Sequence, residues 1–313
     1  MRKKSFLSKN WLKFTDKPAY KLYKYEFARK AKEDLLRDTY RSLQFANIKH
    51  VKEVAQLNGA LSVVHSGNSG DIIYALPTIK KIHEQTGAKI TLYLRLNQPL
   101  VLPAHLKHPL GNVMLNEKMA EMLFALLRQQ PYLAACEIYD GQAIDIDLDG
   151  IRTPLFPTDK GNIARWCSYI TGANPELWKQ WLFVDPDASY ADTIIVARSE
   201  RYRNILIDHS FLNKYKNLVF VGVESEYHDI KKQLPHIKWV PVTNFLELAR
   251  MIAGCKFFIG NQSFPFSIAE GLKIPRILES SFDVINVVPE GDNAYDFLFQ
   301  EHFESLVEAL NYK

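Results

Sequence analysis

The feature that most constrains the fold of this chain is a strand, a glycine-containing turn and a helix that follow one another between residues 61 and 96. An apolar run, LSVVH at 61–65, leads into the turn SGNSGD at 66–71. Apolar residues then recur at helical spacing from Ile72 to Ile82, and ITLYLRL at 90–96 is typical of a second strand. This order forms a βαβ unit, which requires a parallel sheet and a right-handed crossover. The sequence therefore predicts an α/β fold.

The second half of the chain repeats this alternation. Strands are predicted at 193–197, 218–222, 238–242, 256–259 and 276–278, with helices near 211–215, 225–234, 245–253, 266–272 and 293–310. Five strands separated by helices predict a second doubly wound sheet. In the first half, helices at 20–43, 114–129 and 161–171 and a strand at 144–148 complete the pattern, and residues 97–112 read as a long loop.

Polarity rises around 185–187, and a domain boundary is placed there. With 313 residues, of which 47% are hydrophobic, the chain has enough apolar surface for two cores. We expect a basic helical N-terminal extension at 1–58, a first Rossmann-like domain at 59–186 and a second at 187–313. Ligands of such sheets bind at the carboxyl ends of the strands, so the cleft between the two domains is the expected site.

The N-terminal extension carries most of the positive charge. Residues 1–56 hold 15 Lys and Arg against 6 Asp and Glu, whereas the whole chain has a net charge of only +4. A basic arm on a mildly acidic body suggests an anionic partner, either a membrane surface, a phosphorylated glycan or a nucleic acid. A solvated helix face explains the same residues equally well.

Several classes of protein are excluded by the remaining composition. The apolar runs are shorter than the roughly 18–20 residues of a transmembrane helix, and the basic start is not followed by the apolar core of a secretory signal. Cys136, Cys167 and Cys255 are odd in number and widely spaced, which argues against a disulfide framework and a zinc cluster. The expected location is the cytoplasm, with a peripheral position at the inner membrane surface left open.

The turn before the first helix is the first candidate site. Gly67, Asn68, Ser69 and Gly70 let the backbone approach a ligand closely, and they do not form the GxGxxG fingerprint of dinucleotide binding. Asp71 is placed at the helix N-cap. Capping is the simpler explanation for an aspartate there, but its carboxylate could also take a proton from an acceptor hydroxyl.

Two further clusters follow strands of the second half. Arg198, Arg201 and Arg203 come directly after the strand at 193–197, where three guanidinium groups could grip a diphosphate. The alternative is a surface loop paired with Glu200.

The third cluster is a polar turn, Asn261-Gln262-Ser263, before a helix whose start is marked by Pro265. Its backbone N–H groups suit a phosphate, and Glu270 could accept hydrogen bonds from ribose hydroxyls. Equally, the turn residues could serve only the turn, with Glu270 solvated.

A metal site is not predicted. Asp145, Asp147 and Asp149 (IDIDLDG) resemble the start of an EF-hand loop, but its twelfth position, which needs a bidentate glutamate, is Phe156. Alternation in a strand makes the three carboxylates a solvent-facing edge. His105 and His108 are close in sequence but have no carboxylate or cysteine nearby to complete a site.

The stretch GNSGDIIYALPTIKKI at 67–82 resembles the N-terminal motif of the ADP-heptose:lipopolysaccharide heptosyltransferases, glycosyltransferase family nine, in which a Gly-Asp pair opens a helix followed by Leu-Pro. The second half is similar too. It has a basic loop after a strand, a VFVG strand followed by an acidic residue (Glu224 or Glu226), and an IGN strand end before a helix. The resemblance covers roughly residues 60–280, and other GT-B enzymes share much of this layout.

This resemblance implies a GT-B fold, with the acceptor bound by residues 59–186 and a nucleotide-sugar donor by residues 187–313. It implies that Asp71 is the catalytic base and that Arg198 and Arg201 lie where the family's basic residues hold the phosphates. Arg203, Gln262 and Ser263 are the other residues predicted to bind the diphosphate. Asn261, Gln262 and Ser263 match the donor-binding turn, and Glu224 and Glu270 are the candidate nucleotide ligands. The family usually has Asp and a small Ser/Thr-Gly at that turn, and it lacks the basic extension.

The predicted function is transfer of a sugar from a nucleotide-diphosphate donor to an acceptor hydroxyl, with inversion and without a metal or other cofactor. The expected acceptor is a lipopolysaccharide or other surface glycan. Alternatives are a glycosyltransferase that modifies nucleic acid through the basic arm, a catalytically silent protein that binds nucleotide sugars, and a sugar-nucleotide epimerase on the same scaffold.

Overall fold

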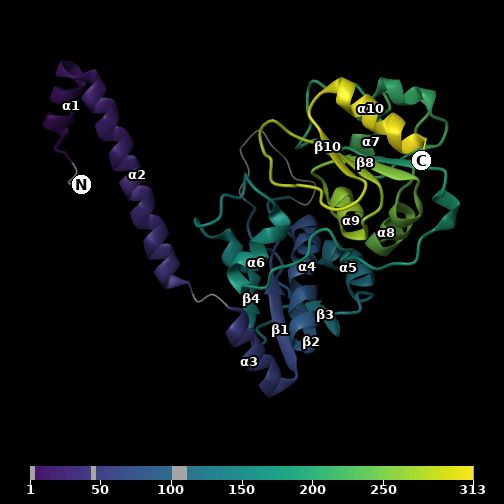
Figure 1. Cartoon of the computed structure of the whole chain (residues 1–313), viewed down its shortest axis with the longest axis horizontal. Coiled ribbons are helices and arrows are strands. Elements are labelled where there is room, and N and C mark those ends of the chain that lie inside the picture. The colour runs from purple at the N-terminus through teal and green to yellow at the C-terminus, as the bar shows by residue number, and fades with distance from the viewer. Residues whose placement is uncertain (1–3, 44–46, 101–110, 313) are drawn as a thin grey trace. The chain divides into compact units, whose positions relative to one another are not determined.

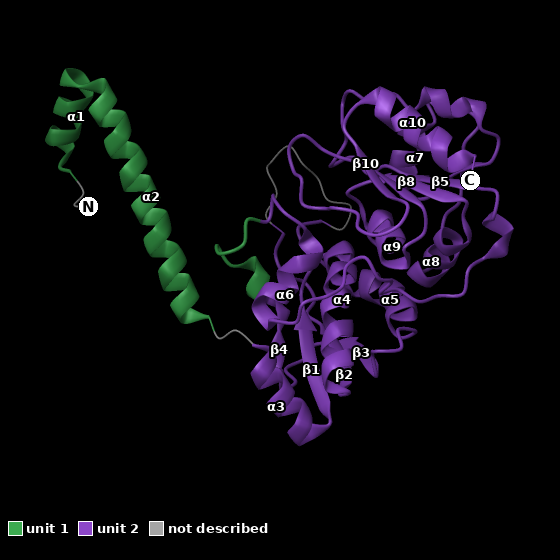
Figure 2. Ribbon diagram, in the orientation of Figure 1, with its two compact units in different colours: residues 1–45, 150–157 green, residues 46–149, 158–313 purple. Residues whose placement is uncertain are grey.

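A computed structural model describes residues 4–43, 47–100 and 111–312 of the chain (Figure 1). The chain divides into two compact units (Figure 2). Residues 1–45 and 150–157 form the first, and residues 46–149 and 158–313, with both sheets, form the second. Within the described ranges no helix is long and apolar enough to cross a membrane.

The first unit is built on two helices, α1 (Phe6–Thr15) and α2 (Lys17–Ser42). Asp16 forms the corner between them. Its N–H donates to the carbonyl of Leu12 and ends α1, while its carboxylate accepts from the N–H of Ala19 at 2.9 Å and caps α2. Pro18 lies in the first turn of α2, where a missing N–H costs nothing. The predicted helix over 20–43 is therefore confirmed as the greater part of α2.

The first sheet has four parallel strands in the order β3-β2-β1-β4. In chain order these are β1 (Ala60–His65), β2 (Lys89–Leu94), β3 (Ala135–Ile138) and β4 (Ile146–Asp147). The helices of this half are α3 (Ile48–Asn58), α4 (Ser69–Thr86), α5 (Glu117–Leu127) and α6 (Trp166–Thr171). Ten of the 18 residues of α4 are buried, since the helix packs against α3, α5 and α6 as well as β2. The βαβ unit predicted at 61–96 is thus confirmed.

The second sheet has six parallel strands in the order β10-β9-β8-β5-β6-β7. They are β5 (Ile194–Ala197), β6 (Leu218–Phe220), β7 (Lys238–Trp239), β8 (Phe257–Asn261), β9 (Arg276–Glu279) and β10 (Ala294–Phe297). The helices are α7 (Glu224–Ile230), α8 (Phe245–Gly254), α9 (Phe264–Leu272) and α10 (Gln300–Asn311). Counted from β5, the strand order is that of the Rossmann fold.

Alternation along the central strands gives this sheet two buried faces. Val196, Phe220 and Ile259 point into one core, which α10 closes with Phe303 and Val307. Phe258 belongs to the opposite face and contacts Phe266 of α9, with ring centroids 6.2 Å apart. Helices on both faces are what an all-parallel sheet requires.

The structure differs from the sequence prediction at short or polar elements. β3, β10 and α3 were not predicted, and the helix expected at 293–310 begins only at Gln300 because residues 294–297 pair with β9 as β10. The residues of α3 were assigned to the N-terminal extension at 1–58. Instead, α3 packs on β1 and α4 and belongs to the second unit. His105, His108 and most of the loop predicted at 97–112 lie outside the described residues.

His209, after β5, is a buried titratable group in the second half. Its ring is 1% exposed, and Nε2 lies 3.6 Å from Oε2 of Glu279. Burial, together with the positive charge of Arg198, lowers the pKa of His209 to about 3. The ring is therefore neutral in the folded protein at neutral pH.

We predict that His209 makes the protein acid-sensitive. An unfolded histidine has a pKa of about 6.5, so between pH 6.5 and 3 the unfolded chain binds a proton that the folded chain does not. The free energy of unfolding should fall as the pH drops through this window, by up to about 1.4 kcal/mol per pH unit from this residue. When the free energy of unfolding is measured with urea from pH 7 to 4, it should fall less steeply in His209→Gln than in wild type. His302→Gln, at an exposed position of α10, is the matched control, and an equal slope in wild type and His209→Gln would contradict the prediction.

Candidate functional site

Each sheet has one point at which the strand order reverses. In the first sheet β1 lies between β2 and β4, and in the second β5 lies between β6 and β8. The loops that leave such neighbouring strands run to opposite faces of the sheet, which opens a crevice at their carboxyl ends where ligands of α/β proteins bind. The candidate site is therefore built from the residues that follow β1, β4, β5 and β8.

The crevice of the first sheet is bridged by Ser66 and Asp149. The N–H and the hydroxyl of Ser66 both donate to Oδ1 of Asp149, at 2.8 and 2.7 Å. Arg95 forms ion pairs with Asp149 and Asp147, the latter at 3.2 Å, and Asp145 accepts from the N–H of Ser62 at 2.7 Å. The predicted alternation is confirmed for Asp145 and Asp147, which are exposed while Ile146 and Leu148 are buried. Asp149 is half-buried, because Ser66 and Arg95 contact its carboxylate.

The turn after β1 places Asp71 in the first turn of α4. Asn68 has the extended backbone of an N-cap residue, and Asp71 is the third residue of the helix, so the predicted N-cap position of Asp71 is wrong. Oδ2 of Asp71 accepts from the N–H of Asn68 at 3.1 Å, which is the carboxylate arm of a capping box. Gly67 and Ser69 are buried, whereas Asn68, Gly70 and Asp71 are half-buried at the end of the helix.

The crevice of the second sheet is bridged in the same way. The N–H and the hydroxyl of Ser199 donate to Oδ1 of Asn261 at 3.0 and 3.2 Å, and Nδ2 of Asn261 donates back to the carbonyl of Ser199 at 2.8 Å. Asn261 is fully buried. Its side chain therefore holds the loop after β5 against the turn after β8, and Ser199 occupies both its oxygen and its nitrogen.

The three arginines after β5 differ in their partners. Arg198 turns into the protein and forms a bidentate ion pair with Glu279 of β9, with N–O distances of 2.7 and 2.8 Å. Arg203 pairs with Asp229 next to a hollow that Arg198 also lines. Arg201 is half-buried over the ring of Tyr202 and has no carboxylate partner among the residues of the described ranges. Of the three, Arg201 is the one whose charge is available to a ligand.

The start of α9 combines backbone donors with a buried amide. Ser263 is the N-cap, its side chain makes no capping hydrogen bond, and the first turn contains no acidic residue. Gln262 is 8% exposed and donates to Asn286 at 2.7 Å, while its Oε1 is buried without a hydrogen-bond partner in the described part of the chain. A buried acceptor of this kind is normally satisfied, so a ligand hydroxyl or N–H group suits it.

The N-termini of α4 and α9 meet. A Cβ atom built on Gly70 would lie 3.8 Å from Cα of Phe264 and 3.9 Å from Oγ of Ser267. Both helices therefore direct the positive ends of their dipoles to the same place. Asp71 offsets the charge at α4, but α9 has no acidic residue in its first turn. The junction of the two helices favours a bound anion on the α9 side.

Glu270 has a different setting from the one predicted. It is 2% exposed, Arg276 and Lys273 both form ion pairs with it, and it also accepts from the N–H of Glu290 at 3.1 Å. Burial lowers the pKa of Lys273 to about 8. Burial also raises the pKa of Tyr74, which faces this cluster from α4, with a further contribution from Glu270. Both oxygens of Glu270 are occupied within the protein, which does not favour contact with a ribose.

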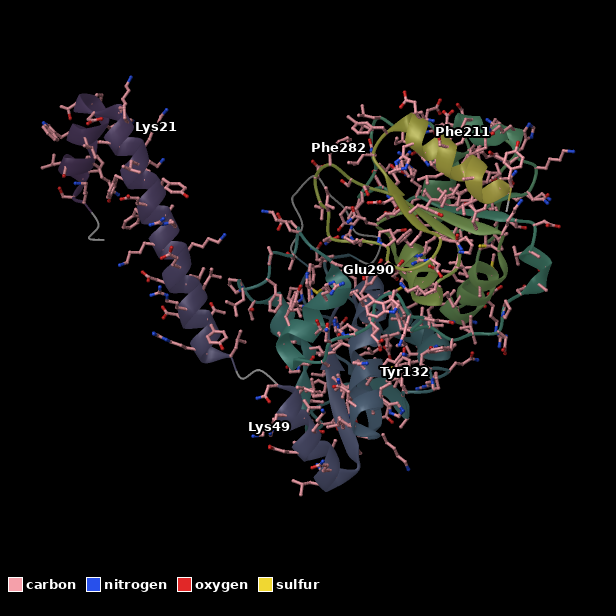
Figure 3. All side chains as sticks on the ribbon, viewed as in Figure 1. Lys21, Lys49, Tyr132, Phe211, Phe282 and Glu290 are labelled. Atoms are coloured by element: carbon pink, nitrogen blue, oxygen red, sulfur yellow. The ribbon has the colours of Figure 1, made fainter. Side chains whose placement is uncertain are left out.

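Glu290 extends this cluster to the first half of the chain. Its carboxylate accepts hydrogen bonds from Arg165 at 2.8 Å and from Asn162 at 3.1 Å (Figure 3). The contacts of Glu290 with Arg165 and Asn162 were not predicted, since these partners are 125 and 128 residues apart in the sequence. Two acidic residues follow β6. Glu224 is exposed and pairs with His228. Glu226 contacts the loop after β5, where it accepts a hydrogen bond from the N–H of Glu200 at 3.3 Å.

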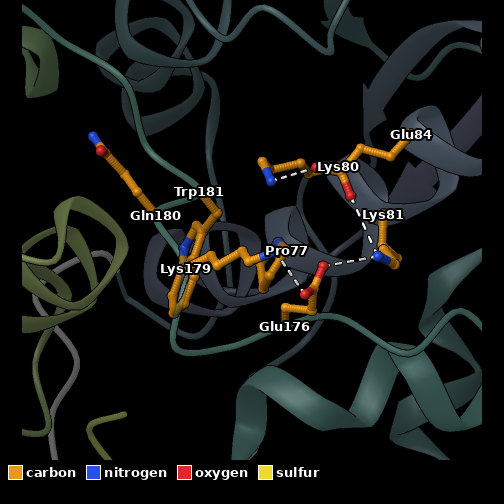
Figure 4. A pocket seen from close by; sticks show the side chains of 8 residues that line it. All are labelled: Pro77, Lys80, Lys81, Glu84, Glu176, Lys179, Gln180 and Trp181. Carbon is orange, nitrogen blue, oxygen red and sulfur yellow. Dashed lines mark hydrogen bonds and ion pairs between the residues drawn. The ribbon is translucent and has the colours of Figure 1, made fainter. Parts of the chain in front are cut away.

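A shallow hollow lies along the second half of α4, away from Asp71 (Figure 4). Its lysines and glutamates are paired with one another, Lys81 with Glu176 at 2.9 Å and Lys80 with Glu84 at 2.5 Å. These mutual pairs leave the hollow with little net charge to offer a ligand.

Within residues 4–43, 47–100 and 111–312 no group of three or more His, Cys, Asp or Glu side chains could hold a metal ion.

The fold of this chain is similar to that of several heptosyltransferases of known structure. ADP-heptose lps heptosyltransferase II of E. coli matches with a TM-score of 0.54 and 13% identity, over 81% of this chain and 98% of that one. E. coli heptosyltransferase WaaC with ADP matches with a TM-score of 0.50 and 12% identity, over 80% and 99%. A dodecameric iron-containing heptosyltransferase, TibC in complex with ADP-D-beta-D-heptose, matches with a TM-score of 0.50 and 12% identity, over 76% and 63%.

The chain therefore has the GT-B fold of two Rossmann-like halves, as the sequence predicted. No protein-family profile and no curated protein matches the sequence. At 12–13% identity the likeness concerns the fold alone.

We predict that the Glu270 cluster is essential for stability. Glu270→Gln removes the charge that compensates Arg276, which is 0% exposed, and an uncompensated buried charge costs about 3–5 kcal/mol. The urea midpoint of Glu270→Gln should fall accordingly, as followed by circular dichroism. Glu224→Gln, at an exposed glutamate, is the matched control and should unfold like wild type. A loss below about 1 kcal/mol for Glu270→Gln would show that the cluster is not a major source of stability.

Proposed function

We propose that the protein is a GT-B glycosyltransferase that moves a sugar from a nucleotide-diphosphate donor to an acceptor hydroxyl. The observation that carries the proposal is the contact between the N-termini of α4 and α9, where one helix brings a carboxylate and the other brings uncompensated positive charge. Sugar transfer needs both, a base for the acceptor and a stabiliser for the departing diphosphate.

The donor diphosphate is assigned to the start of α9. The backbone N–H groups after Ser263 provide fixed positive charge where the leaving group becomes more negative. Arg201 is assigned as the side-chain cation, because it lies in the loop that Ser199 and Asn261 hold against this turn. Oε1 of Gln262 is an acceptor, so it suits a hydroxyl of the donor better than a phosphate oxygen. This modifies the expectation from sequence, in which Gln262 and all three arginines held the diphosphate.

Asp71 is assigned as the base. In the proposed step the acceptor oxygen forms a bond to the anomeric carbon while its proton passes to the Asp71 carboxylate, and the bond from that carbon to the diphosphate oxygen breaks. Attack from the face opposite the leaving group inverts the anomeric carbon. The hydrogen bond from Asn68 to Oδ2 holds the carboxylate in one orientation, which favours proton transfer in a defined direction. Helix dipoles and Arg201 supply the charge stabilisation that a metal supplies in other transferases.

The GT-B fold and the resemblance at 67–82 support a lipopolysaccharide or other surface glycan as the acceptor and a nucleotide-activated heptose or hexose as the donor. The turn Asn261-Gln262-Ser263-Phe264 differs from the pattern of the resembled family, so several donors have to be compared. A suitable panel is ADP-heptose, ADP-glucose, UDP-glucose and GDP-mannose.

We predict that Asp71→Asn lowers kcat by about 10²- to 10⁴-fold with little change in donor affinity, because the amide cannot take a proton but can still accept the hydrogen bond from Asn68. Release of nucleoside diphosphate reports turnover with each donor, and the shift in melting temperature on adding donor reports binding.

Asp140→Asn, at an exposed position after β3, is the matched control and should keep full activity. Full turnover by Asp71→Asn would remove Asp71 as the base. Failure of the wild-type protein to bind or turn over any donor of the panel would count against the proposed reaction itself.

A further inference from the structure

The outer face of α1 is apolar and exposed. Leu7, Trp11 and Phe14 recur at intervals of four and three residues, which places them on one side of the helix. They are 79%, 68% and 80% exposed, and Phe6 beside them is 77% exposed. Four large apolar side chains in one ten-residue helix are more than the single exposed residues that a protein surface normally carries. We call this set of four the α1 apolar face.

The α1 apolar face belongs to a folded element. Leu12, on the other side of α1, is half-buried, and the helix packs on α2. The N–H of Lys4 donates to the hydroxyl of Tyr23 at 2.9 Å, and Tyr23 is itself 4% exposed. Asp16 fixes the corner between the two helices. These contacts turn the α1 apolar face away from α2, so it needs another partner.

Positive charge surrounds the same element. Residues 1–25 hold eight Lys and Arg and one acidic residue, Asp16, whose carboxylate is used as the cap of α2. Lys13, Lys17 and Lys21 are exposed, and Lys21 projects from α2 at the end next to α1 (Figure 3). The strongest concentration of positive charge in the chain thus lies on the element that exposes the α1 apolar face.

We propose that α1 and the first turns of α2 bind the surface of an anionic lipid bilayer, with the α1 apolar face inserted among the acyl chains and the lysines at the headgroups. A helix with Leu, Phe and Trp on one face and Lys around it has the composition of an interfacial membrane helix. Each lysine near the surface adds electrostatic attraction to anionic lipid. A nucleic acid would use the lysines, but it offers no apolar phase for Leu7 and Phe14. This binding is independent of the proposed sugar transfer.

The experiment measures co-flotation of the full-length protein with phosphatidylcholine vesicles that contain about 30% phosphatidylglycerol, with pure phosphatidylcholine vesicles for comparison. Wild type should bind the anionic vesicles at least about tenfold more tightly than the neutral ones, and binding should weaken in about 0.5 M NaCl. The variant Leu7→Ser/Trp11→Ser/Phe14→Ser should lose at least about tenfold in affinity for the anionic vesicles. Lipids brominated in their acyl chains should quench tryptophan emission more in wild type than in Trp11→Phe.

Leu35→Ser/Tyr40→Ser is the matched control, since it removes two exposed apolar side chains from the far half of α2 and should bind like wild type. Equal binding by the triple variant and wild type would overturn the proposal. So would tighter binding to duplex or single-stranded nucleic acid than to vesicles, with no effect of the triple variant. A stable dimer in the absence of lipid that the triple variant dissociates would also overturn it, because a second copy would then cover the α1 apolar face.

Discussion

The ion pairs and hydrogen bonds of the buried Glu270 carboxylate are the interactions on which the link between the two halves depends. It holds Arg276 and Lys273 in the interior and accepts from the backbone of Glu290, whose own carboxylate binds Arg165 and Asn162 of the first half. A charge this deeply buried persists only when every partner is in place, so the cluster fixes its neighbours with little freedom. The cluster joins α9 to residues 162–165, which pack on α4, so it supports the place where the N-termini of α4 and α9 meet.

The two halves close their crevices by the same device. Ser66 binds Asp149 in the first sheet, and Ser199 binds Asn261 in the second, in each case across the point where the strand order reverses. The bridges hold the loops in place and satisfy polar groups that would otherwise be buried without partners. They also leave the helix N-termini, rather than the strand ends, as the surfaces that a ligand can reach.

Much of the fold could be predicted from local patterns, whereas the pairing of charges could not. The unit β1–α4–β2 has strong hydrophobic periodicity and a clear turn, and it was predicted nearly to its bounds. β3 and β10 are four residues long and partly polar, so their pairing decides their structure. Asn68 and Asp71 are both residues that cap helices, and the sequence could not distinguish the cap from the third residue. Arg198 finds Glu279 81 residues along the chain, a distance at which spacing carries no information.

The use of cations inside the second half explains why the proposed anion site relies on the backbone. Arg198, Arg203, Lys273 and Arg276 all lie near the ends of strands or helices, yet each forms an ion pair with a carboxylate of the protein. An arginine committed in this way stabilises the fold and has little charge left for a ligand, since binding one would require breaking a bond already made. Backbone N–H groups at the start of α9 have no such competitor, because no acidic side chain stands in that turn. An anion recognised mainly by these groups and by Arg201 would be bound through groups whose positions are set by the helix itself.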